Sequence, residues 1–163
     1  MKFEKILVPL DGSAIAEAAL PKAVELIRKN DDATLILLRA TEATTLPCVD
    51  PIDAQVTVVR EAEEYLETVA ARLRKEGVPG VKTSVWYGAA APGILEVARM
   101  TKPDVIVMST HGRRKFGRLL FGSVTESVLR DTQTPIFLIR IDGTSVETPV
   151  GRAAARERET ANV

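Results

Sequence analysis

The sequence predicts an α/β protein: a single-domain open five-stranded parallel sheet with helices on both faces. Three observations lead to this prediction. Five short apolar or β-branched runs recur along the chain, stretches with helical periodicity separate them, and four of the runs are apolar at every position. Parallel strands covered by helices on both faces have this composition, so the runs are expected to form one layered sheet. They span residues 6–8, 35–38, 81–87, 105–108 and 136–139.

Four helices are predicted between these runs, in chain order. The first, near residues 14–29, carries Pro21 in its interior, so we expect a kink or a late helix start. The second ends before Gly77, a residue suited to the left-handed turn that closes a helix. The third opens at residues 91–92, with a proline in a tolerated early position, and the fourth opens near Ser123. The second helix has an apolar face made of Val58, Ala62, Tyr65, Leu66, Val69 and Leu73.

The third run, residues 81–87, differs from the others because its residues alternate, with Val81, Thr83 and Val85 on one face and Lys82, Ser84 and Trp86 on the other. Alternation is typical of a strand with one face in the core and the other in water. We therefore predict a half-exposed edge strand at this position.

The domain is predicted to span residues 1–141, because a chain of 163 residues has the length of one domain and these residues contain all five runs. From Asp142 onward the chain has no Ile, Leu, Phe or Met, and it mixes Gly, Pro and Ala with charges of both signs. Such a segment cannot bury enough apolar surface to fold. We predict that residues 142–163 form a disordered tail.

The charge and cysteine content exclude several classes of protein. Lys plus Arg and Asp plus Glu both number 22, so the formal net charge is zero and no overall field attracts nucleic acid or an anionic membrane. The single Cys48 excludes a disulfide framework and a cysteine zinc site. The single His111 leaves one candidate base. With no signal sequence or long apolar run, we expect a soluble, cytoplasmic protein.

The loops that follow the first and fourth strands carry the candidate site. Ligands of open α/β sheets bind beyond the carboxyl ends of the strands, where the strand order reverses. Asp11 follows the first strand, while Gly112 and Gly122 flank a basic loop after the fourth. Glycine permits positive φ and close backbone approach to a ligand, and Gly122 and Ser123 open a helix whose free N–H groups favour an anion. The loop contains the cations Arg113, Arg114, Lys115 and Arg118, which could neutralise a polyphosphate.

Each of these features also has a purely structural interpretation. The cations could be solvated surface charges. Ser123 and Glu126 fit a capping box, which needs no ligand, although a capping serine could still meet a phosphate oxygen. Asp11 could contact a ribose or base, bind a metal through water, or simply belong to a turn before a helix. A lone histidine before a glycine, as His111 is, is more often a structural hydrogen-bonding residue than a general base.

The common nucleotide-binding motifs are absent or altered. Residues 112–119 read GRRKFGRL, in which Arg118 and Leu119 replace the lysine and the hydroxyl residue of a P-loop. No G-x-G-x-x-G follows the first strand, which argues against a dinucleotide-binding domain.

The loop after the fourth strand resembles the nucleotide-binding loop of the universal stress protein family. Members that bind nucleotide carry G-x2-G-x9-G-[ST], and Gly112, Gly122 and Ser123 match its last three fixed positions, whereas Ser109 stands at the first glycine. The similarity extends over residues 3–141, including the opening KILVPLDGS and residues 88–98. It implies an adenine nucleotide alpha hydrolase-like, Rossmann-like fold with strand order 3-2-1-4-5.

The resemblance also implies the residues of a site for ATP, or for ADP or AMP, with or without Mg²⁺. Near adenine and ribose it places residues of the first, second and fourth strands: Pro9, Asp11, Ala40, Met108 and Ser109. Around the phosphates it places Gly112, Arg113, Gly122, Ser123, Val124 and Thr125. A homodimer is implied as well, and the apolar run Ile136–Ile141 supplies an independent reason, because an uncovered apolar edge strand would pair with other chains.

Three functions follow from this sequence. The favoured one is a homodimeric, ATP-binding stress-response module that changes its conformation or partner surface with nucleotide occupancy. The second is a slow nucleotide hydrolase or phosphotransfer enzyme, for which Asp11 and His111 are the only visible candidates. The third is a nucleotide-free dimeric interaction protein, which is favoured if Ser109 blocks the pocket. No catalytic residue and no resident metal site are predicted.

Overall fold

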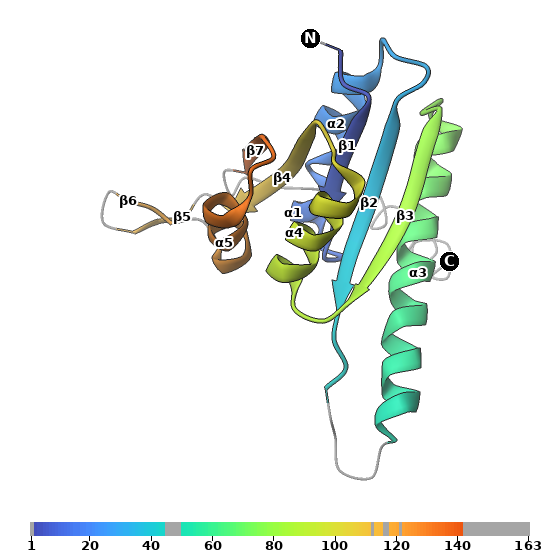
Figure 1. Ribbon diagram of the computed structural model, residues 1–163, viewed down its shortest axis with the longest axis vertical. Coiled ribbons are helices and arrows are strands. Elements are labelled where there is room, and N and C mark those ends of the chain that lie inside the picture. Colours follow the sequence, from blue (N-terminus) through green and yellow to red (C-terminus); the bar gives the residue numbers. More distant parts are fainter. Residues whose placement is uncertain (1, 45–49, 112, 116–117, 121, 142–163) are drawn as a thin grey trace, which may run out of the picture.

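The main sheet of the protein has five parallel strands in the order β3-β2-β1-β4-β7 (Figure 1). The computed structural model describes residues 2–44, 50–111, 113–115, 118–120 and 122–141. The predicted order 3-2-1-4-5 is confirmed, since β7 is the fifth strand of this sheet along the chain. The strands are β1 (Lys5–Pro9), β2 (Thr34–Thr41), β3 (Gly80–Tyr87), β4 (Val105–His111) and β7 (Ile136–Ile141).

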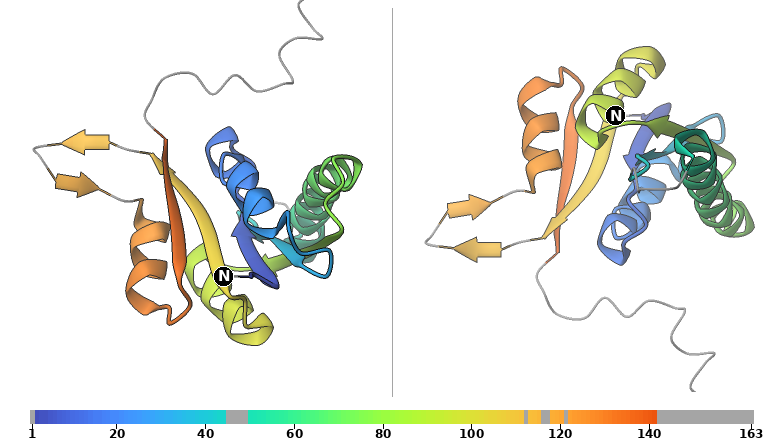
Figure 2. Two further views of the ribbon diagram at one scale, coloured as in Figure 1. Left: turned by 90° about the horizontal axis from the view of Figure 1, so that it is seen from above. Right: turned by 90° about the horizontal axis from the view of Figure 1, so that it is seen from below.

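Helices cover both faces of this sheet, as predicted (Figure 2). On one face, α2 (Leu20–Ile27) and α3 (Pro51–Lys75) pack on strand residues such as Ile6 and Val8. On the other, α4 (Ala90–Thr101) and α5 (Ser123–Asp131) pack on residues such as Leu7. Successive side chains of a strand point to opposite faces, so each buried strand contributes to both cores.

Proline determines where the first helical stretch divides. The first helical stretch consists of α1 (Ala14–Glu17) and α2. Pro21 lies in the first turn of α2, where its missing N–H needs no partner. The expected late helix start is confirmed. Gly77 follows the end of α3 with a φ of +88°, as predicted for a residue in the left-handed turn. Cys48 lies outside the described residues.

The two edge strands of the sheet are β3 and β7. In β3, Val81 is buried whereas Lys82 is exposed, which confirms the predicted half-exposed edge. All residues of β7 are half-buried or exposed, and 39% of Phe137 is accessible. The fully apolar run of this strand therefore does not reflect burial on both faces.

A separate antiparallel ribbon follows β4, where the sequence led us to expect only a basic loop. It consists of β5 (Arg113–Lys115) and β6 (Arg118–Leu120), and it projects outward from the main sheet (Figures 1 and 2). β5 consists of cations alone, and β6, with the sequence RLL, is too short to show an apolar alternation by which the sequence could reveal it.

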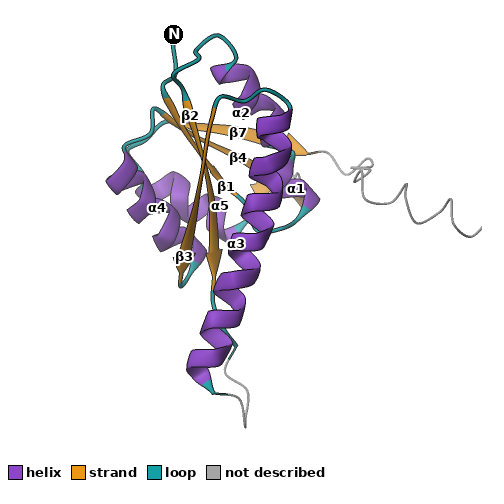
Figure 3. Ribbon diagram, turned by 90° about the vertical axis from the view of Figure 1, so that its right-hand side faces the viewer, coloured by secondary structure: helices purple, strands orange, loops and turns teal. Residues whose placement is uncertain are grey.

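At the other side of the molecule, the first turns of α3 extend beyond the carboxyl ends of β2 and β3 (Figure 3). No helix within the described ranges is both long and apolar enough to cross a membrane. The predicted tail, residues 142–163, lies outside the described residues.

Candidate functional site

A cavity opens at the carboxyl ends of β1 and β4, where the strand order of the sheet reverses. Connections from these neighbouring strands leave toward opposite faces, which creates a crevice at this point in open α/β sheets. The cavity has a volume of about 140 Å³. Its walls are mainly apolar and come from β1, β2, β4, α1, α4 and α5: Pro9, Leu10, Asp11, Ala16, Leu38, Ala40, Ala90, Ile94, Met108, Ser109, Val124 and Thr125. We call this space the apolar lobe.

A second space adjoins the apolar lobe and has a more polar character. It shares Asp11, Ala16, Ser109, Val124 and Thr125 with the apolar lobe, and its volume is about 290 Å³. The residues that it adds are Ser13, Ile15, Thr110, Gly122 and Ser123. We call it the polar lobe. Together the two lobes form one site with an apolar end and an end that adds hydroxyl groups and the backbone of Gly122.

The structure brings together all the predicted site residues whose side chains it describes. Pro9, Asp11, Ala40, Met108, Ser109, Val124 and Thr125 line the apolar lobe. Gly122 and Ser123 join them in the polar lobe. Gly112 lies outside the described residues, as do the side chains of Arg113 and His111. That these residues bind a nucleotide remains a prediction.

The first turn of α5 forms one wall of the polar lobe. Its N-cap is Gly122 rather than Ser123, so the predicted capping box is wrong by one residue. Gly122 has φ −61° and ψ 153°, an extended conformation open to any residue, so this position does not require glycine. The first bond of the helix is donated by the Glu126 N–H to the Gly122 carbonyl, at 2.9 Å.

Gly122 has no side chain with which to cap the helix, and the N–H groups of the first turn are therefore left without a partner in the helix. These are the amides of Ser123, Val124 and Thr125, and no side chain within the described ranges accepts from them. They point out of the N-terminal end of α5, where the helix dipole adds partial positive charge. The polar lobe therefore offers donors to an anion.

Asp11 lies where the two lobes meet, in a tight turn that leads into α1. Its Oδ1 accepts from the Ser13 N–H at 2.8 Å, and the Ser13 hydroxyl accepts from the Ala16 N–H at 3.1 Å to cap α1. The turn places Gly12 at a φ of +88°. The structural interpretation of this Asp-Gly-Ser segment is thus confirmed. The Asp11 carboxylate is nevertheless exposed and lines both lobes.

Ser109, at the position of the missing glycine, also lines both lobes. Its hydroxyl donates a hydrogen bond to the Ile15 carbonyl of α1. The side chain thereby connects the carboxyl end of β4 to α1 instead of being free to fill the cavity.

Several lining residues were not predicted from the sequence. Leu38 could have been found, because it precedes Ala40 by two residues and therefore shares its face of β2. Ile94 and Ala16 had no such signal, since only the packing of α4 and α1 brings them to the site. No group of three or more potential metal ligands occurs in the described part of the chain, and Asp11 is the only acidic residue lining the two lobes there.

Comparison with known proteins identifies relatives over most of the chain. The sequence model of the Universal stress protein family matches residues 2–140. A putative universal stress protein from Staphylococcus epidermidis is 29% identical over 145 residues, which cover 87% of each chain. The structure of the universal stress protein UspA from Lactobacillus plantarum is 28% identical, with a TM-score of 0.66, and the match covers 86% of this chain and 99% of that one.

Two more distant structures share the fold and contain an adenine nucleotide. One is a universal stress protein in complex with cAMP, 22% identical with a TM-score of 0.66, matched over 85% of this chain and 98% of that one. The other is a universal stress protein family protein from Arabidopsis thaliana with AMP bound. It is 17% identical with a TM-score of 0.62, and the match covers 86% of this chain and 93% of that one.

Proposed function

The chain belongs to the universal stress protein family, and we propose that it binds an adenine nucleotide. In this proposal ATP is the preferred ligand, and the protein acts as a homodimeric stress-response module. Two proteins of the same fold are known with cAMP or AMP bound. The proposal for this chain rests on its own cavity, since the two lobes match the two chemically different ends of a nucleotide.

The apolar lobe would hold the adenine ring. Pro9, Ala40 and Met108 present apolar walls from three neighbouring strands, and Leu38 and Ile94 add aliphatic surface. A flat ring loses its contact with water between such walls, and burial contributes about 25 cal/mol for each Å² of apolar surface removed from water.

Asp11 would contact the ribose at the junction of the lobes. A carboxylate accepts hydrogen bonds from sugar hydroxyls, and this carboxylate is exposed beside the space that the sugar would occupy. The same side chain is the only carboxylate of the described lining residues that could approach a Mg²⁺ ion carried by the phosphates. Mg²⁺ commonly binds through one carboxylate together with substrate phosphates.

The single observation that carries the proposal is the uncapped first turn of α5 in the polar lobe. The amides of Ser123, Val124 and Thr125 are left without helical partners beside the apolar lobe. Phosphate oxygens are the acceptors that helix N-termini bind readily. The Ser123 hydroxyl, which does not cap the helix, would be a further donor to them.

Titration calorimetry with ATP, AMP and adenosine on the purified protein tests this function. We expect binding of all three, with ATP tightest because it adds phosphate contacts at α5. Nucleotide carried through purification, detected by absorbance and mass, would be an independent sign. If the protein binds neither ATP nor AMP at millimolar concentration, the proposed function is wrong and the nucleotide-free interaction protein is favoured.

The homodimer is proposed to form through β7. This edge strand exposes part of Phe137 and leaves one row of backbone groups without a neighbouring strand in the sheet. An antiparallel copy of the strand would cover both, with two-fold symmetry.

Sedimentation analysis of two aromatic-to-glutamate variants tests the dimer. Phe137→Glu places a charge on the proposed interface, whereas Tyr87→Glu makes the same change on the opposite edge strand β3, where 42% of Tyr87 is exposed. We expect the native protein and Tyr87→Glu to sediment at twice the chain mass of 17.7 kDa and Phe137→Glu at the chain mass. A monomeric native protein would overturn the proposal.

A further inference from the structure

Helix α1 separates the polar lobe from α3. It is a single turn, Ala14–Glu17, and none of its residues is fully buried. Ile15 and Ala16 line the polar lobe together with the preceding Ser13. A helix of one turn has little intrinsic stability. The side chains that hold α1 in place therefore determine the position of this wall.

On the side of α3, the contacts converge on Glu17. The Tyr65 hydroxyl donates to Glu17 Oε1 at 3.0 Å, and Arg72 Nη2 lies 2.6 Å from Glu17 Oε2. Burial, together with the negative charge of Glu17, raises the pKa of Tyr65 well above its ordinary value. The hydroxyl therefore keeps its proton and stays a donor throughout the physiological pH range.

The Tyr65 ring also supports the turn that precedes α1. The Arg39 guanidinium lies 4.8 Å from the ring centroid, a cation–π distance. The same guanidinium is 3.4 Å from the position that a Cβ on Gly12 would occupy, so it packs against the turn that contains Asp11. Arg39 is next to Ala40 in β2 and therefore points to the opposite face of the sheet from the apolar lobe. Tyr65 thus supports both the turn and α1 from the side of α3, away from the cavity.

On the cavity side, α1 is held by the hydrogen bond that Ser109 donates to the Ile15 carbonyl. The short helix is therefore fixed between β4 and α3. We propose that Tyr65 and Glu17 are positioning residues that set the width of the polar lobe, and thereby determine how strongly the protein binds the phosphate part of a nucleotide relative to the nucleoside part.

The selectivity follows from which elements form each lobe. The apolar lobe is built largely from β1, β2, β4 and α4, whereas the polar lobe lies between α1 with its preceding turn and the first turn of α5. An outward movement of α1 would widen the gap that phosphates must bridge to reach the α5 amides. It would leave most of the adenine walls in place. The inference rests on the proposed function, and it predicts a difference between two ligands of the same site.

The test measures ATP and adenosine affinity by titration calorimetry in the native protein and in variants. Tyr65→Phe removes the hydroxyl and keeps the ring beneath Arg39, and Glu17→Ala removes the acceptor. We expect ATP affinity to fall roughly three- to tenfold in Tyr65→Phe, the effect of one lost side-chain hydrogen bond, with adenosine affinity unchanged. Glu17→Ala should lose at least as much. Glu17→Gln should restore most of the affinity, because an amide oxygen still accepts from Tyr65.

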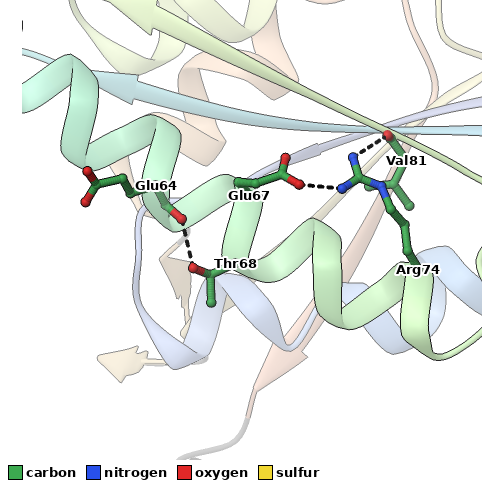
Figure 4. A network of polar contacts seen from close by, with 5 residues as sticks. All are labelled: Glu64, Glu67, Thr68, Arg74 and Val81. Carbon is green, nitrogen blue, oxygen red and sulfur yellow. Dashed lines mark hydrogen bonds and ion pairs between the residues drawn. The ribbon is translucent and has the colours of Figure 1, made fainter.

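Glu67→Ala is the matched control on the same helix. Glu67 pairs with Arg74 Nη1 at 2.5 Å, and Arg74 also donates to the Val81 carbonyl at 3.2 Å (Figure 4). Neither Glu67 nor Arg74 lines the apolar or polar lobe, and their polar contacts within the described part of the chain do not involve α1. Removing this ion pair costs α3 a comparable interaction, and we expect no change in either affinity. Urea denaturation of every variant establishes that the fold is retained.

The outcomes separate this inference from the proposed function. A native protein that binds ATP, with Tyr65→Phe and Glu17→Ala binding it equally well, overturns the positioning role and leaves the function intact. Equal losses for ATP and adenosine also overturn it, since the effect would then not act on the phosphate side. A native protein that binds no nucleotide overturns the proposed function itself.

Discussion

Replacing Gly122 by valine would separate the stability of α5 from the binding proposed at its first turn. The ideal Cβ at this position meets no heavy atom within 4 Å, and the φ of −61° is open to any residue. The variant should therefore fold. Losing glycine at an N-cap costs about 0.5–1 kcal/mol of unfolding free energy, because branched residues are poor caps.

The effect of Gly122→Val on ATP should be larger than its effect on the fold. The branched side chain would project from the N-cap of α5, where we place the phosphates, and would keep them from the amides behind it. A hydrogen bond to a charged group contributes about 1.5–3 kcal/mol, so losing one lowers the affinity roughly ten- to hundredfold. Adenosine, which has no phosphate, should bind as before.

Titration calorimetry and thermal unfolding check this prediction on the same samples. ATP should stabilise the native protein to heat and leave Gly122→Val nearly unaffected, because the stabilisation by a ligand grows with its concentration relative to its dissociation constant. Gly122→Ala, with a single methyl group, should fall between the two. Equal ATP affinity in native protein and Gly122→Val would refute the assignment of phosphates to this helix.

Three further predictions concern stability and chemistry. A Cβ on Gly93 would lie 2.6 Å from Cγ of Trp86, so the added methyl group of Gly93→Ala would overpack this contact. We expect the free energy of unfolding to fall by about 1–3 kcal/mol, more than the helix gains from alanine. A native-like urea midpoint would contradict this prediction. The carboxylate of Asp104 accepts from the N–H groups that open β1, at 2.7 and 2.8 Å, so Asp104→Ala should cost about 1–3 kcal/mol in urea denaturation, with Asp104→Asn close to native. Turnover of ATP should stay far below the roughly 1–1,000 per second of typical enzymes, and phosphate release at such rates that is lost in Asp11→Ala would favour a hydrolase instead.

The sequence carries enough information for the sheet and for most of the cavity lining. Burial imposes a period of two on strands and 3.6 on helices, so the apolar runs and the interruption at Pro21 are sufficient to locate the main elements. Parallel strands end at one edge of the sheet, which is why Asp11 and Ser109, far apart in the chain, could be expected beside one cavity.

Tertiary structure alone decided how that cavity is held in shape. The bond from Ser109 to Ile15 joins residues 94 positions apart, and the contacts of Glu17 with Tyr65 and Arg72 span 48 and 55 positions. No local periodicity encodes such pairs. The N-cap of α5 was misassigned for a related reason: Ser123 has the residue type of a cap, but the chain enters the helix with Gly122 at that position. Residue type and spacing thus determined which groups at the strand ends and in the loops reach the site. Packing between distant segments brought in lining residues such as Ile94 and Ala16, and it determined the orientation and partners of the others.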